Sequence, residues 1–154
     1  MRRPGSRFGL ICREGAVKKS GESEALIGVL NQSLGVEYGA LFLLPQHLAR
    51  ISDRVLQRHL RGIMEMELEH AEKTARIIIA LGGQPTADMP NLRPRNSARE
   101  ILKVHLAGEK RAIELYSQAA AQCPDAKLRE MLLELQREEE GHQRLIEADL
   151  AKLE

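Results

Sequence analysis

Four stretches of the chain carry apolar residues at alternating spacings of four and three, the spacing of a helix face that packs into a bundle. In each stretch a glutamate interrupts the apolar series near its middle, and in two of them a histidine follows three residues later. The interrupting residues are Glu37, Glu67 with His70, Glu109, and Glu139 with His142. This pattern predicts an all-α fold, a four-helix bundle with six polar side chains facing its interior.

Residues that start and stop helices place the first two of these elements. We expect the first helix to begin at Ser23, as its N-cap, and to run to about Arg50, with Pro45 predicting a kink or an early end. The second helix should follow Asp53 and continue to Leu81. The link between these two helices is short, so they should lie side by side.

The second and third helices are joined by a long crossover. Gly82 and Gly83 stop the second helix, and three prolines keep the next roughly 15 residues non-helical: Pro85, Pro90 and Pro94. Ser97 and Glu100 form a capping-box pattern that opens the third helix, and residues 123–125 separate it from the fourth. Two short connections and one long crossover complete the predicted topology.

Composition agrees with a helical protein and gives no electrostatic signature of a partner. Hydrophobic residues make up 43% of the chain and aromatic residues only 3%, whereas strands favour β-branched and aromatic residues. The net charge of +1 indicates neither nucleic acid nor a membrane surface as a partner.

The N-terminus differs from the rest of the chain. Residues 1–20 hold six basic residues against Glu14, a local charge of +5, so the remainder carries about −4 of the total +1. No apolar run in this arm is long enough for a signal-peptide core or a membrane span. We therefore predict a flexible basic arm over residues 1–20 and the bundle over residues 21–154. Cys12 and Cys123 form no CxxC pair or disulfide framework, which favours the cytoplasm.

Four carboxylates in one core require compensation, because buried charges are costly unless they are paired. Two divalent cations supply +4 against the −4 of the four glutamates, and glutamate with histidine suits iron or manganese. Glu139 and His142 are therefore expected to face inward as ligands. Their neighbours Glu138 and Glu140 are expected to face the surface, with Glu140 placed to pair with Arg144.

At these residues the chain resembles the bacterioferritins and the wider ferritin-like di-iron proteins, whose pattern of Glu and Glu-x-x-His is the same. The resemblance lies in four segments: LNQSLGVE (30–37), ELEHA (67–71), HLAGE (105–109) and REEEGH (137–142). It implies two iron ions per chain, with manganese or zinc as other possibilities. It also implies ferroxidation, the oxidation of Fe(II) by O₂ or peroxide, for iron storage or detoxification. The implied roles are terminal ligands for Glu37 and Glu109, bridging ligands for Glu67 and Glu139, and one metal each for His70 and His142.

Three departures from the family qualify what the resemblance implies. The position of the family's haem-ligating methionine is Leu68, and Met66 faces elsewhere on the helix, so we expect no haem. Leu44 stands where the family often has a tyrosine. The family's short fifth helix has no counterpart before Glu154. The resemblance implies dimers along the first two helices, and the missing helix favours a homodimer over a 24-subunit shell.

Other functions are compatible with the same pattern. A rubrerythrin-like peroxide reductase would need electrons from another protein, since no CxxC pair is present. An oxygenase-type di-iron enzyme is a further alternative, but the sequence carries no signature of a substrate channel. A non-enzymatic helical module with a polar seam is the third. His47 and His105 are expected to be hydrogen-bonded core or surface residues rather than ligands, and Tyr116 a core packing residue rather than a redox group.

Overall fold

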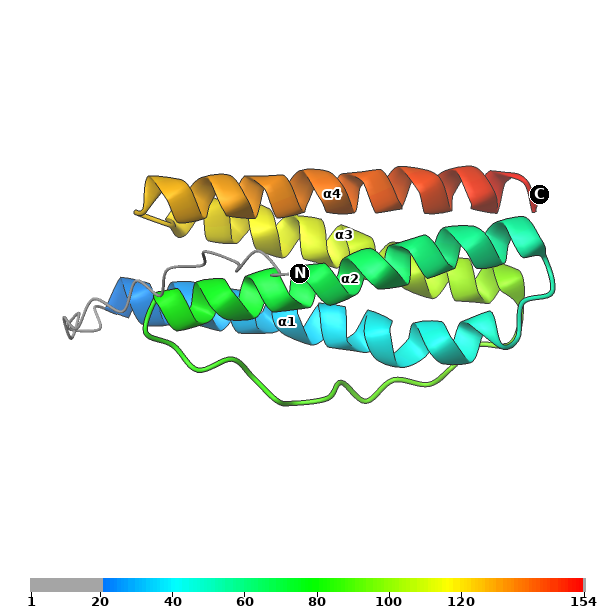
Figure 1. Ribbon diagram of the computed structural model, residues 1–154, viewed down its shortest axis with the longest axis horizontal. Coiled ribbons are helices and arrows are strands. Elements are labelled where there is room, and N and C mark those ends of the chain that lie inside the picture. Colours follow the sequence, from blue (N-terminus) through cyan, green and yellow to red (C-terminus); the bar gives the residue numbers. More distant parts are fainter. Residues whose placement is uncertain (1–20, 154) are drawn as a thin grey trace, which may run out of the picture.

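Residues 21–153, the part of the chain that this computed structural model describes, form four long helices in a bundle (Figure 1). The helices are α1 (Gly21–Leu48), α2 (Arg54–Ala80), α3 (Ala98–Gln122) and α4 (Ala126–Ala151). α1 packs against α2 and α3, and α4 packs mainly against α3. The fold is the predicted all-α bundle with one long crossover. The basic arm and Glu154 lie outside the described residues.

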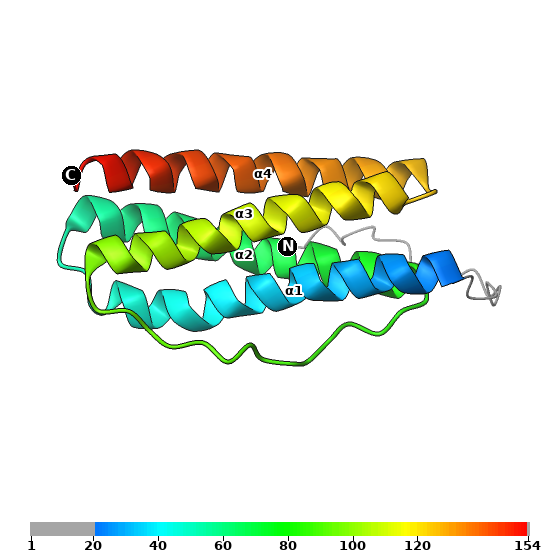
Figure 2. The ribbon, with the colours of Figure 1, turned by 180° about the vertical axis from the view of Figure 1, so that it is seen from behind.

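The crossover, residues 81–97, runs the whole length of the bundle alongside α1 (Figures 1 and 2). Near its start lies Gly82, whose φ of 75° is a left-handed conformation that favours glycine. It ends at Ser97, whose side chain and that of Glu100 form the predicted capping box of α3. Its course beside α1 places crossover residues over the groove between α1 and α3.

Two expectations about α1 need correction. Gly21, the first described residue, is already helical, so Ser23 lies within α1 instead of preceding it. The helix also continues through Pro45 and ends at Leu48. Pro45 has no N–H to bond the Leu41 carbonyl one turn earlier, and α1 ends three residues after it. Asp53 accepts hydrogen bonds from two backbone N–H groups of α2, and Asp125 does the same for α4.

The apolar core is divided into two clusters with a polar layer between them. One cluster includes Leu30, Leu34 and Leu132, and the other includes Leu60 and Ile146. Each fully buried leucine or isoleucine stabilises the fold by about 1.5–3 kcal/mol. These two clusters exclude water from both ends of the polar layer.

Of the helices in residues 21–153, α1 alone has the length and hydropathy of a membrane span, with a mean hydropathy of 1.3 in its most apolar window. Half of that window is buried inside the bundle, and every such window within the helix contains Glu37. The core helix of a bundle has the same features, because it is covered by its neighbours.

Candidate metal centre

The six predicted ligands lie together in the polar layer, and none of them is more than 5% exposed. Each of the four helices contributes a glutamate, and α2 and α4 each add a histidine one turn later. Four of the six form a tight group with ligand atoms within 4.8 Å of one another: Glu67, His70, Glu139 and His142. Glu37 and Glu109 flank this group from α1 and α3 and are not part of it.

The two imidazoles turn their Nδ1 atoms toward the two central carboxylates. His70 Nδ1 lies 2.8 Å from Glu139 Oε1, and His142 Nδ1 lies 3.2 Å from Glu139 Oε2. His142 Nδ1 is also 2.9 Å from Glu67 Oε1. The two rings stack with centroids 5.4 Å apart. Glu67 and Glu139 therefore lie between the histidines, as two bridging carboxylates would.

One buried oxygen in this group lacks a hydrogen bond. Among residues 21–153, Glu67 Oε1 is the buried side-chain polar atom that makes no hydrogen bond, although it forms an ion pair with His142 Nδ1. Burying a carboxylate oxygen without a hydrogen bond is costly, even with a charged ring nearby, and native proteins rarely do so. A bound cation would satisfy this oxygen, so the donor set fits a pair of divalent metal ions.

The carboxyl groups divide into two kinds. Burial and the neighbouring Glu67 charge raise the pKa of Glu37 well above its usual value. Burial, with the charges of Glu67 and Glu139, does the same to the pKa of Glu109. Burial also acts to raise the pKa values of Glu67 and Glu139, but hydrogen bonds from their neighbours outweigh it and lower both. Without metal, these shifts favour the neutral acid at Glu37 and Glu109 and the carboxylate at Glu67 and Glu139.

The histidines hold extra protons. Burial by itself lowers the pKa of each imidazole, but the adjacent carboxylates raise the pKa of His70 to about 10 and that of His142 to about 12. Two imidazolium ions therefore face two carboxylates, and the metal-free centre is neutral. When all four glutamates are ionised and both histidines are neutral, the charge of −4 on these residues balances the +4 of two divalent cations. The centre can thus exchange protons for metal without burying net charge.

Both histidines have a partner on the outer side of the ring that sequence reasoning missed. His70 Nε2 lies 3.0 Å from Glu138 Oε2, and Lys73 Nζ lies 3.3 Å from the same oxygen. His142 Nε2 lies 3.3 Å from the sulfur of Met66. Glu138 was expected to face the surface and instead reaches across to α2. These contacts join different helices, so no spacing within one helix could have indicated them.

The predicted pair of Glu140 with Arg144 is replaced by a different contact. Gln136, one turn earlier on α4, donates to Glu140 at 3.0 Å. Both partners lie at the same four-residue spacing from Glu140, so helix periodicity alone could not choose between them.

Tyr116 is a core residue, as expected, and it also supports the centre. Its hydroxyl donates to Glu37 Oε1 at 2.7 Å. Thr74 Oγ1 lies 2.8 Å from the same hydroxyl and must be the donor to it, because the phenol has one proton. Both side chains are fully buried. This chain of hydrogen bonds fixes the Glu37 carboxyl from behind.

His47 and His105 pair with each other outside the group of ligands. The backbone N–H of Arg95 donates to His47 Nε2 at 2.9 Å. The proton of His47 is therefore on Nδ1, which donates to His105 Nε2 at 2.8 Å. Burial lowers the pKa of both rings, that of His105 to about 4. The pair is a neutral core contact that fastens the end of the crossover, in agreement with expectation.

A four-helix bundle with Glu and Glu-x-x-His donors from all four helices defines the class of carboxylate-bridged di-metal proteins. A family model described as the ferritin-like domain matches residues 29–154, and the chain belongs to this family. Among solved structures, it is similar to a ferritin-like, diiron-carboxylate protein from Bacillus anthracis str. Ames, with 25% identity and a TM-score of 0.77. That match covers 86% of this chain and 99% of the other. No curated protein matches the chain at a significant level.

Proposed function

We propose that this protein is a di-iron ferroxidase, an oxidoreductase that oxidises Fe(II) with O₂ or peroxide for iron storage or detoxification. The observation that carries the proposal is the buried group of Glu67, His70, Glu139 and His142, whose ligand atoms lie within 4.8 Å of one another. Carboxylate and imidazole donors suit iron, and also manganese or zinc. The proposed partners are Fe(II) and the oxidant, in the cytoplasm that the cysteine usage predicts.

The six side chains divide the work of holding two ions. Glu67 and Glu139 lie between the histidines and would bridge the ions, while His70 and His142 would each bind one. Glu37 and Glu109 would complete the set from the two sides. Iron supplies the redox chemistry, each Fe(II) giving one electron to the oxidant. The protein fixes the ligand geometry and neutralises the charge.

Proton movement is built into the ligands. Glu37 and Glu109 have raised pKa values and must lose their protons when they bind a cation. Tyr116 then donates to an ionised Glu37 carboxylate.

The test is aerobic Fe(II) oxidation by the purified full chain. We expect two metal ions per chain and oxidation faster than in buffer. Glu67→Ala and Glu139→Ala should each remove most of this activity, because each deletes a central carboxylate. Glu72→Ala is the matched control, since Glu72 is an exposed α2 glutamate paired with Arg76.

Oxidation at the wild-type rate in either central variant would mean that the site is assigned wrongly. A rate that is fast with peroxide but slow with O₂ would favour the rubrerythrin-like alternative. If the protein bound no metal and showed no activity, the remaining alternative would be the non-enzymatic helical module.

A further inference from the structure

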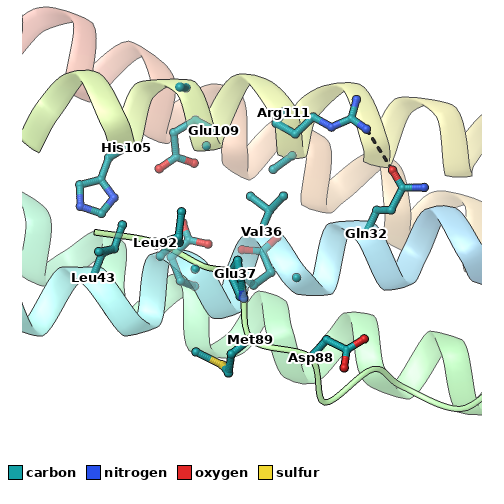
Figure 3. Close-up of a pocket in the computed structure, with 18 of the residues that line it drawn as sticks. Gln32, Val36, Glu37, Leu43, Asp88, Met89, Leu92, His105, Glu109 and Arg111 are labelled. Atoms are coloured by element: carbon teal, nitrogen blue, oxygen red, sulfur yellow. Dashed lines mark hydrogen bonds between the residues drawn. The ribbon is translucent and has the colours of Figure 1, made fainter. Parts of the chain in front are cut away.

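A cavity of about 710 Å³ opens beside the metal centre, between α1, α3 and the crossover (Figure 3). Its lining includes three of the six candidate ligands, Glu37, Glu67 and Glu109. This volume lies within the range of pockets that hold small organic molecules, roughly 300–1,000 Å³. The sequence carried no signature of such a space.

Three glycines leave room where α1 and α3 face the cavity. Gly28 and Gly35 of α1 and Gly108 of α3 line it, and a Cβ added to any of them would meet nothing within 4 Å. Glycine weakens a helix interior relative to alanine, and close packing does not explain these three. Gly39 is the contrast, since its Cβ would lie 2.8 Å from Leu92 of the crossover.

The walls are largely apolar, and polar groups lie at both ends, with His105 and Glu109 at one of them. Val36, Leu43 and Leu92 contribute aliphatic side chains. Figure 3 shows His105 and Glu109 pointing from α3 into the space between α3 and α1. Such a lining, apolar with a few convergent polar groups, is typical of a ligand site.

The tautomer of His105 gives this end a hydrogen-bond donor. Because His105 Nε2 accepts from His47, its proton lies on Nδ1. Within residues 21–153 no hydrogen bond to that Nδ1 is found, and His105 is 4% exposed while lining the cavity. Glu109, one turn along α3 and 5% exposed, supplies carboxyl oxygens.

Charge restricts the occupant. Asp88 adds a fourth acidic group to the lining, whereas the cation Arg111 lies at the other end, engaged by Gln32 and Glu114. With metal bound, the ions balance the ligand carboxylates and Arg111 balances Asp88, so an anion would lose its hydration without meeting a net positive charge. A small hydrated cation would be stripped of water by the apolar walls. A neutral molecule avoids both costs.

We propose that this cavity binds a neutral, largely apolar organic molecule with one hydroxyl group. The hydroxyl accepts from His105 Nδ1 and donates to Glu109, and the apolar body lies along Gly35 and Gly108. The molecule would therefore rest against the carboxylates of the metal centre. This binding goes beyond iron oxidation and does not depend on it.

The test measures equilibrium binding of 2-naphthol to the zinc-saturated full chain. We expect saturable binding of one molecule per chain. Gly35→Leu and Gly108→Leu should each weaken it by about tenfold or more, because the added side chain fills the cavity. Gly62→Leu is the matched control: Gly62 is also a helix-interior glycine with nothing within 4 Å of a Cβ, and it does not line the cavity. His105→Leu should weaken binding while leaving the zinc content unchanged.

Lack of saturable binding below about 1 mM, or equal binding to Gly108→Leu and wild type, would overturn the proposal. The proposal would also be overturned if wild type bound no naphthol and the Gly108→Leu variant had a lower native mass than wild type. Those two results would mean that a second copy of the chain covers the cavity in the wild-type protein. A zinc content and a melting temperature close to those of wild type show that a variant is folded. Since zinc is redox-inactive, these outcomes are separate from success or failure of the ferroxidase assay.

Discussion

Glu138 and His70 form a carboxylate–histidine pair across the α2–α4 interface, with 3.0 Å between Glu138 Oε2 and the outer nitrogen of the ring. The corresponding nitrogen of His142 meets the thioether of Met66, an uncharged and weaker acceptor. An anionic partner makes the imidazole a more basic ligand and holds its orientation. The two halves of the centre are therefore not equivalent, although the ligands themselves are arranged symmetrically.

We expect Glu138→Gln to lower the affinity for the first bound metal by about 10–100-fold, the usual cost of losing such a partner. Isothermal titration with zinc measures this directly. Glu140→Gln is the control, because Glu140 lies two residues after Glu138 on α4 and contacts Gln136 instead of a candidate ligand. Equal affinities in the two variants would show that Glu138 does not support His70.

Loading the centre should release about four protons for every two divalent ions near pH 7. Two come from the neutral acids Glu37 and Glu109, and two from the imidazolium forms of His70 and His142. Titration calorimetry in buffers of different ionisation enthalpy counts these protons. Metal should also raise the melting temperature, because it binds the folded state. Release of no protons would contradict the charge states described above.

The metal-free protein should lose stability as the pH rises from about 6.5 to 10. In this window the folded chain keeps protons on His70 and His142, whose pKa values are about 10 and 12, while the unfolded chain releases them near 6.5. Glu37 and Glu109 act in the same direction. Because the folded state binds more protons, its stability falls with rising pH.

Thermal melts of chelator-treated protein across this pH range test the prediction. Zinc-saturated protein is the control, since its ligands have already lost these protons and the fall should be much smaller. A melting temperature that rises with pH in the metal-free protein would contradict it.

No haem should be bound. Leu68 is 61% exposed on α2 and offers no ligand atom, and the Met66 sulfur is engaged by His142. Visible spectra of protein expressed with added haem precursor provide the measurement. A spectrum of methionine-ligated haem would show that this expectation is wrong.

In solution the chain should be a homodimer of roughly 35 kDa, twice the 17.3 kDa of one chain. Leu68 and Ile79 of α2 are each 61% exposed and Phe42 of α1 is 44% exposed, so apolar side chains of both helices are left for a partner. Light scattering on the native protein measures the mass. A value more than about ten times that of the chain would indicate a shell instead.

The inward-facing positions of the six candidate ligands could be predicted from the sequence because they depend on helix periodicity, which is a local property. Once Leu30 or Leu60 faces the core, Glu37 or Glu67 at seven-residue spacing must face it too. The starts of α2 and α3 could be predicted for the same reason, because the N-cap side chains of Asp53 and Ser97 bond to backbone N–H groups only two or three residues away. The start of α1 predicted at Ser23 is wrong, because Gly21 is already helical.

The tertiary structure alone decided what lies between the helices. The contact of Glu138 with His70, that of Met66 with His142 and the pairing of His47 with His105 each join different helices. These contacts depend on the rotation and separation of the helices, which the packing of the whole core sets. The cavity is the clearest case: Gly35 and Gly108 are far apart in the sequence, and only the placement of α1, α3 and the crossover leaves a space between them.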